Sequence, residues 1–160
     1  MVLINLDRCL IDCGGESIAR MIPPFTQEGG EIYDGNDNQI LVREGVREML
    51  GQLFKAGITL AVFGETDRPD IARWVMHHLN LESCFTHFGL NHDGRQDQIS
   101  RVRRKAQMEI DDLLVIDNLH GGGPEWCEAS GVVCYAIPGH GGLTSQHFEA
   151  ALDLYRINAP

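Results

Sequence analysis

Three acidic side chains stand where this sequence could do chemistry. Asp7, Glu65 and Asp117 each lie at or just after the end of a short apolar run. Carboxylates in such places serve in general acid and base catalysis or hold a hard cation. Asp7 is the first candidate for proton transfer, and a second carboxylate near it, at Glu65, would raise its pKa toward neutrality. The alternative is that Asp7 caps the following turn and that Asp117 is an ordinary turn residue.

The elements that must position these residues alternate along the chain. Apolar runs predict strands, and segments with one apolar face predict helices between them. The strands are Val2–Leu6, Thr59–Phe63, Leu113–Ile116 and Val132–Ile137, and the helices are Arg43–Ala56, Pro69–Leu79 and Ser100–Gln107. This order predicts an α/β fold, a parallel sheet covered by helices on both faces. Ligands bind beyond the carboxyl ends of such strands, so the segments 5–7, 64–67 and 117–118 should meet in one crevice.

One segment departs from this alternation. Ile32-Tyr33 and Ile40–Val42 flank the turn-rich stretch 34–38, which predicts a β-hairpin. Pro23-Pro24-Phe25 precedes the hairpin as an extended stretch. We expect a single domain over 1–160, with a small flap over about 13–42.

Composition narrows the class of protein. The chain has 160 residues and a net charge of −10, which argues against nucleic acid and anionic membranes as partners. It lacks an apolar run long enough for a membrane span. Its five cysteines form no CxxC pair and are odd in number, which is typical of reduced thiols in a cytoplasmic protein.

Read together, these motifs resemble the haloacid dehalogenase (HAD) phosphatases, and most of all the small magnesium-dependent phosphatase-1 type. Asn5-Leu6-Asp7 follows a buried strand where that family has Asp-x-Asp, and Pro23-Pro24-Phe25 with Gly29-Gly30 is similar to its short flap. The resemblance covers nearly the whole chain. It implies a three-layer α/β/α HAD-like domain without a large cap. An uncapped crevice suits a small-molecule substrate or one attached to a carrier or protein.

The resemblance also shows where this chain differs from the family. The family's nucleophilic aspartate is Asn5, its phosphate-binding Ser or Thr is Gly64, and its following Arg is Glu65. Its lysine aligns with Arg95, its acidic metal pair with Asp117-Asn118, and its Thr of the first motif with Cys9. An amide is a very poor nucleophile and adds no negative charge to a metal site.

The residues and the resemblance together give a candidate site. Catalytic roles are expected at Asp7, Asn5 and Glu65, substrate contacts at Arg8, Cys9, Gly64, Thr66, Arg95 and Asn118, and a weak or absent metal site at Asp117 and Asp7.

Three functions are compatible with this site. The first is a repurposed enzyme, in which Asp7 acts as general acid and base on a non-phosphate substrate, by elimination, cyclisation or isomerisation in a biosynthetic pathway. It follows from the loss of phosphate-holding groups and requires no cofactor, although Mg²⁺ is the ion that the site could hold. The second is an inactive pseudophosphatase that binds a ligand. The third is a magnesium-dependent phosphatase in which Asn5 traps the substrate. The oligomeric state stays open.

Other features carry weaker expectations. Cys9 and Cys13 could supply a thiolate nucleophile, but buried inert cysteine is the commoner state. The glycines of His120–Gly123 could bind an anion through backbone amides or form only a turn, and Gly139–Gly142 is expected to be a loop near the site. The basic residues of 101–105 are expected on a solvated helix face.

Overall fold

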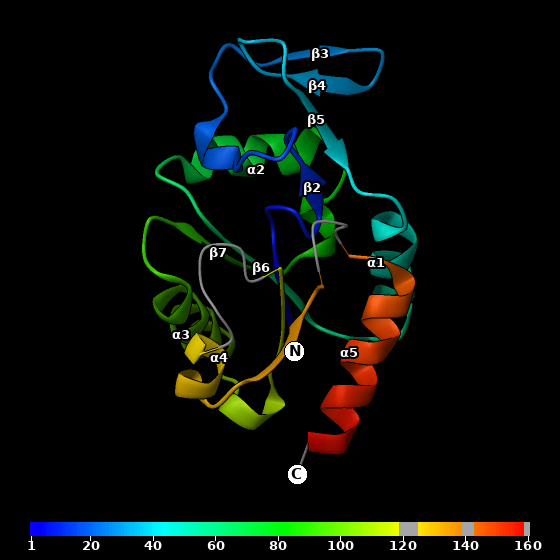
Figure 1. Ribbon diagram of the computed structural model, residues 1–160, viewed down its shortest axis with the longest axis vertical. Helices are drawn as coiled ribbons and strands as arrows, with labels where there is room; N and C mark the ends of the chain where they lie inside the picture. Colours follow the sequence, from blue (N-terminus) through cyan, green and yellow to red (C-terminus); the bar gives the residue numbers. More distant parts are fainter. Residues whose placement is uncertain (119–124, 139–142, 159–160) are drawn as a thin grey trace.

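The central feature of the computed structural model is a parallel sheet. The model describes residues 1–118, 125–138 and 143–158. Within them the five-stranded sheet has the order β7-β6-β1-β8-β9, so β1 lies in the middle (Figure 1). The strands are β1 (Val2–Asn5), β6 (Leu60–Glu65), β7 (His87–Asn91), β8 (Leu114–Asp117) and β9 (Val133–Ala136). All four residues of β1 are buried because helices cover both faces of the sheet.

Helices pack on the two faces and make three layers. The helices are α1 (Val46–Lys55), α2 (Pro69–His78), α3 (Arg95–Ala106), α4 (Glu125–Ser130) and α5 (Ser145–Asn158). Short 3₁₀ turns cover Ile18–Arg20, Glu82–Cys84 and Ile110–Asp112. Residues of α1, α2 and α5 share one core with Ile4, Val62 and Ile116, whereas α3 packs on the opposite face against Leu3 and Phe63. The predicted three-layer α/β/α fold is confirmed.

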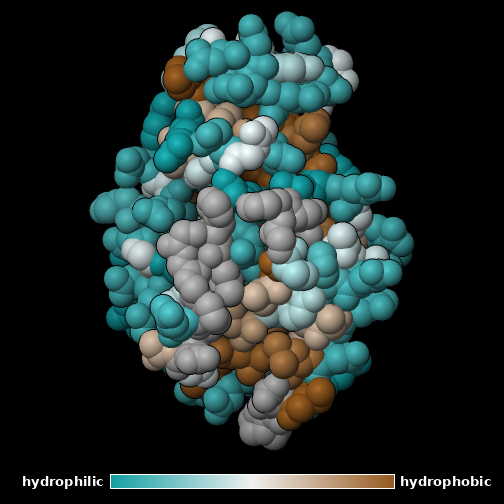
Figure 2. Space-filling model, viewed as in Figure 1, coloured by the Kyte–Doolittle hydropathy of each residue, from teal (hydrophilic) through white to brown (hydrophobic). Residues whose placement is uncertain are grey.

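The flap is a second, antiparallel sheet that stands at one end of the molecule (Figure 1). Its order is β2-β5-β4-β3. The strands are β2 (Ile11–Asp12), β3 (Thr26–Glu28), β4 (Glu31–Tyr33) and β5 (Gln39–Val42). The predicted hairpin is confirmed by the pairing of Ile32 with Ile40. Figure 2 shows that the flap end is mostly hydrophilic on the viewed face.

The structure also corrects the expected elements. Strand β7 lies in a segment with no assigned element, α3 begins at Arg95 rather than Ser100, and α5 was not anticipated. The segments 120–123 and 139–142, where an anion-binding turn and a loop near the site were expected, lie outside the described residues. Among the described helices, none is long and apolar enough to cross a membrane.

Candidate active site at the carboxyl edge of the sheet

A cavity of about 130 Å³ opens where strands β1 and β6 end. It is lined by Asn5, Asp7, Arg8, Ser17, Phe63, Gly64, Glu65, Arg95 and Asn118. Most of the residues predicted for the site are therefore brought together, from the three segments that were expected to converge. Asp117 lies directly behind Asn5, whereas Cys9 and Thr66 lie outside the lining.

Asp117 is the buried centre of the polar network behind the cavity. It is completely buried at the end of β8. The Nδ2 atom of Asn5 donates a hydrogen bond of 2.6 Å to Asp117 Oδ1. Arg95 Nε lies 2.9 Å from Asp117 Oδ2, an ion pair that lacks the alignment of a hydrogen bond. One amide and one guanidinium thus hold the two oxygens of a single carboxylate.

Asp7 faces the base of the flap. Its Oδ2 accepts a 2.7 Å hydrogen bond from the Ser17 hydroxyl, and its Oδ1 accepts one of 2.7 Å from the Ile18 amide. Burial raises the pKa of Asp7, and these two hydrogen bonds oppose the rise. The direction agrees with the expectation, but the cause is desolvation and not the charge of Glu65. Ser17 was not predicted, because only the folded loop brings it near Asp7.

Arg8 sits in a strained turn that follows β1. Its φ is +64°, a conformation that costs a residue with a side chain about 1–2 kcal/mol. The turn is held because the Arg8 amide donates to the Ile11 carbonyl at 3.0 Å. The Arg8 guanidinium donates to the Gly15 carbonyl and also lines the cavity. The turn therefore places a permanent positive charge at the mouth of the crevice.

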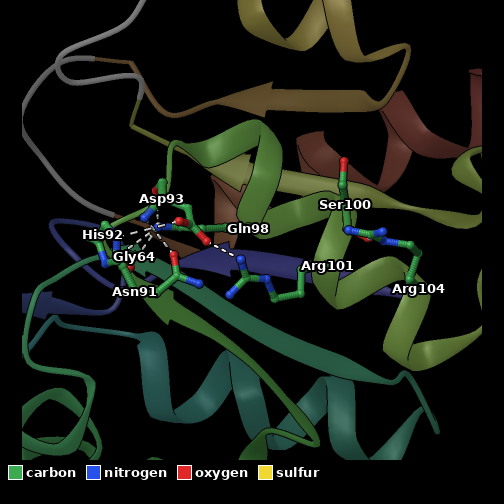
Figure 3. Close-up of polar contacts among 8 residues, drawn as sticks. All are labelled: Gly64, Asn91, His92, Asp93, Gln98, Ser100, Arg101 and Arg104. Carbon is green, nitrogen blue, oxygen red and sulfur yellow. Dashed lines mark hydrogen bonds and ion pairs between the residues drawn. The ribbon is translucent and has the colours of Figure 1, made fainter.

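Gln98 ties together the ends of β6 and β7 (Figure 3). It is completely buried on α3, and its Nε2 donates to the carbonyls of Gly64 at 3.2 Å, Asn91 at 3.0 Å and Asp93 at 2.7 Å. Arg101 adds an ion pair to Asp93. The first residue of α3, Arg95, is thereby fixed relative to Gly64. Sequence reasoning missed Gln98 because a polar residue is not expected on the buried face of a helix.

Gly64 is closely packed at the place where the resemblance expects a hydroxyl, so a side chain there would need its neighbours to shift slightly. A Cβ atom there would lie 3.3 Å from Leu6 Cβ and 3.9 Å from Asn5 Oδ1. The next residue, Glu65, is exposed, so solvent screens its charge. Thr66 is buried, and its hydroxyl accepts a 3.0 Å hydrogen bond from the Arg68 amide, which makes it part of the turn into α2.

The cysteines near the crevice are not activated. Cys9 and Cys13 are both buried free thiols. Burial raises the pKa of each thiol, and the neighbouring carboxylates raise it further. A thiol held in its protonated form is a poor nucleophile, so the inert state is the one that the surroundings favour.

The oxygen atoms in and behind the crevice do not suit Mg²⁺ in this arrangement. Both oxygens of Asp117 face nitrogen groups, and the main-chain carbonyl of Asp7 accepts a 3.0 Å hydrogen bond from Asn118 Nδ2. The described residues contain no group of three His, Cys, Asp or Glu side chains that could hold a metal ion. Magnesium prefers carboxylate ligands, and the carboxylate that contacts the Asn5 side chain, that of Asp117, is already paired with the Arg95 guanidinium.

Solved structures confirm the class of fold. An Ehrlichia chaffeensis HAD-superfamily hydrolase matches with a TM-score of 0.61 at 13% identity, over 98% of this chain and 96% of that chain. CbbY from Rhodobacter sphaeroides, solved in complex with phosphate, matches with a TM-score of 0.57 at 13% identity, over 86% and 85%. The N-terminal part of a Bacteroides fragilis protein contains a phosphatase domain and was solved with Mg. It matches with a TM-score of 0.61 at 18% identity, over 96% of this chain and 39% of that chain. Among curated proteins, none matches this chain.

The fold and the crevice define a protein of the HAD superfamily. Within it, the chain belongs to the acid phosphatase family, whose model matches residues 1–158.

The family corrects the first of the three expected functions. The expectation of a repurposed enzyme acting on a non-phosphate substrate is wrong, because the family match and the phosphatase neighbours support phosphatase chemistry. That expectation followed from the loss of phosphate-holding groups and from the change of the family's Arg to Glu65. In the structure Glu65 is exposed, and two guanidinium groups, of Arg8 and Arg95, line the same cavity.

Proposed function

We propose that the crevice recognises the phosphoryl group of a phosphate monoester, and that phosphoryl transfer stops at Asn5. The observation that carries this proposal is the match of the acid phosphatase family over residues 1–158, with two arginines lining the cavity. One structural neighbour was solved in complex with phosphate, and another contains a phosphatase domain. Both support phosphate esters as the class of ligand. This chain would then be a phosphatase-type protein that holds its ligand without turning it over.

The size and charge of the cavity suit the phosphoryl end of such a ligand. Guanidinium groups bind phosphate oxygens in pairs of parallel hydrogen bonds, and they stay charged at every relevant pH. A cavity of about 130 Å³ accepts the phosphoryl group and leaves the rest of the ester outside, beside the flap. We therefore propose that the ligand is a phosphate ester of a small molecule, or one attached to a carrier or a protein.

Asn5 explains why transfer would stop. In the phosphatase reaction a nucleophilic oxygen forms a bond to phosphorus, the ester P–O bond breaks, and the leaving oxygen takes up a proton. The amide of Asn5 is a poor nucleophile, and it is held in place by the Asp7 amide at 3.2 Å and by Asp117 at 2.6 Å. Asp7 would be the proton donor in this proposal, and burial raises its pKa, which is the direction that suits a general acid.

Two measurements test this proposal. Titration calorimetry with inorganic phosphate should show saturable binding to the wild-type protein, and Arg95→Gln should weaken it. Assays with p-nitrophenyl phosphate, with and without MgCl₂, should show no turnover for the wild type. Asn5→Asp supplies a nucleophilic carboxylate, and its turnover should exceed the background rate measured with the wild type at least tenfold, which corresponds to about 1.4 kcal/mol in the activation free energy.

The matched control is Asn80→Asp, which makes the same chemical change at an exposed position after α2. It should bind phosphate like the wild type and hydrolyse nothing. Absence of phosphate binding by the wild type, together with an inactive Asn5→Asp, would refute the proposal.

A further inference from the structure

We propose that the Arg95 guanidinium is the built-in cation of this crevice, and that with the Asn5 amide it closes Asp117 to Mg²⁺. The related Bacteroides phosphatase domain was solved with Mg. In this chain the positive charge beside Asp117 would instead come from the side chain of Arg95, the first residue of α3. The inference concerns metal binding alone and does not depend on phosphate as the ligand.

The contacts of Asp117 give the first step. A metal ion at Asp117 needs a carboxylate oxygen that is open to it. Oδ1 accepts the 2.6 Å hydrogen bond from Asn5 Nδ2, and Oδ2, which accepts no hydrogen bond from the described residues, lies 2.9 Å from the positively charged guanidinium of Arg95. The Asn5 amide directs a hydrogen at Oδ1, and the guanidinium places a full positive charge beside Oδ2, where it would repel a second cation. On this completely buried carboxylate, Mg²⁺ would therefore have to displace Asn5 from Oδ1 or sit beside the Arg95 charge at Oδ2.

The remaining oxygens give the second step. Asn5 Oδ1 accepts a hydrogen bond from the Asp7 amide at 3.2 Å, and the Asp7 carbonyl accepts one from Asn118 Nδ2 at 3.0 Å. The Asp7 carboxylate is turned toward Ser17 and Ile18 at the base of the flap. Recruiting these oxygens would cost several hydrogen bonds, and Mg²⁺ also loses its own water reluctantly.

The charge balance gives the third step. A buried carboxylate without a counter-charge is strongly unfavourable, and the Arg95 guanidinium removes that cost because it cannot lose its proton. Asn5 is neutral, so the pair of Asp117 and Arg95 has no net charge to attract a divalent ion. An aspartate at position 5 would place its carboxylate about one hydrogen-bond length from that of Asp117. The two negative charges would repel each other, and a bound cation would relieve that repulsion.

Titration with MgCl₂ tests the inference, with NaCl of equal ionic strength as the reference. For the wild type we expect no saturable heat, and the same Tm in MgCl₂ as in EDTA. For Asn5→Asp we expect saturable binding and a Tm that rises with MgCl₂ and falls in EDTA. The control Asn80→Asp adds the same charge at an exposed site and should behave like the wild type.

The MgCl₂ titration of the wild type tests the inference even if a variant fails to fold. Saturable Mg²⁺ binding by the wild type that disappears in Asp117→Asn would overturn the inference. An Asn5→Asp protein that folds but shows no response to MgCl₂ would also count against it, because the added carboxylate would then not be what the site lacks. Phosphate binding is measured separately, so failure here leaves the proposed function untouched.

Discussion

At the scale of single residues, one amide changes what the neighbouring groups can do. Asn5 turns its Nδ2 toward Asp117, so a residue in the place of the family's nucleophile acts as a hydrogen-bond donor. Asp7, two residues later, keeps a half-buried carboxylate that accepts hydrogen bonds from Ser17 and Ile18. The nucleophile and the proton donor of the site are therefore separable, and Asp7 can be tested by itself.

Replacement of Asp7 by asparagine tests whether its proton is held more tightly in the folded protein. Burial raises its folded pKa above the ordinary 3.8. Its favourable contribution to the free energy of unfolding is therefore complete below the ordinary pKa and is lost as pH rises through the folded pKa. Asparagine does not titrate. As pH increases through the folded pKa of Asp7, Asp7→Asn should therefore become more stable relative to the wild type, by about 1.4 kcal/mol for each unit by which folding raises that pKa.

Urea unfolding at a series of pH values between 3 and 8, a range of about five units around this transition, measures the difference. The exposed Asp67→Asn is the control and should show a nearly constant difference from the wild type. An Asp7→Asn difference that does not change with pH would contradict the raised pKa.

At the scale of elements, α3 does more than cover the sheet. Its first residue, Arg95, reaches Asp117. Its buried Gln98 donates to the carbonyls of Gly64, Asn91 and Asp93 (Figure 3). The ends of β6 and β7 are thereby fastened to the start of the helix. Gln98 is a positioning residue, because it acts on the crevice through Gly64 and Arg95 without lining the cavity.

Replacement of Gln98 by leucine should loosen this connection. Three carbonyls lose their shared donor, and each hydrogen bond contributes about 1 kcal/mol net, so we expect a loss of about 1–3 kcal/mol in the free energy of unfolding. Arg95 should also be less well placed, so phosphate binding should weaken while the protein remains folded. Chemical denaturation and calorimetry measure the two effects. Gln96→Leu, on the exposed side of α3, is the control, and equal effects of both substitutions would exclude the positioning role.

The same helix shows what the sequence could and could not predict. Strands β1, β6, β8 and β9 follow from their apolar runs, and the meeting of their ends follows from the parallel order. The start of α3 was placed at Ser100, because a buried Gln98 breaks the apolar pattern. The contact of Arg95 with Asp117 depends on that missed first turn. Strand β7, an edge strand with His87 and Gly89, has too few apolar residues to stand out.

At the scale of the whole molecule, the sheet joins two hydrophobic cores. Leu3, Ala61 and Val115 point into the core under α3, and their neighbours Ile4, Val62 and Ile116 point into the larger core on the other face. Successive residues of a strand face opposite sides, so the same three strands build both cores. Loss of either helical layer would expose the apolar face of the sheet, which should make the two layers unfold together.

The two tryptophans can test this coupling because they report on opposite faces. Trp74 on α2 packs against the larger core, and Trp126 on α4 packs against the smaller one. Trp126→Phe leaves Trp74 as the only tryptophan, and Trp74→Phe leaves Trp126. In each variant, we expect the fluorescence and far-ultraviolet circular dichroism transitions in urea to share one midpoint, as a two-state transition requires. If Trp126 reports an earlier transition than circular dichroism does, α4 and the small core unfold independently of the sheet. The crevice, which depends on α3 in that same layer, would then lose Arg95 before the rest of the protein unfolds.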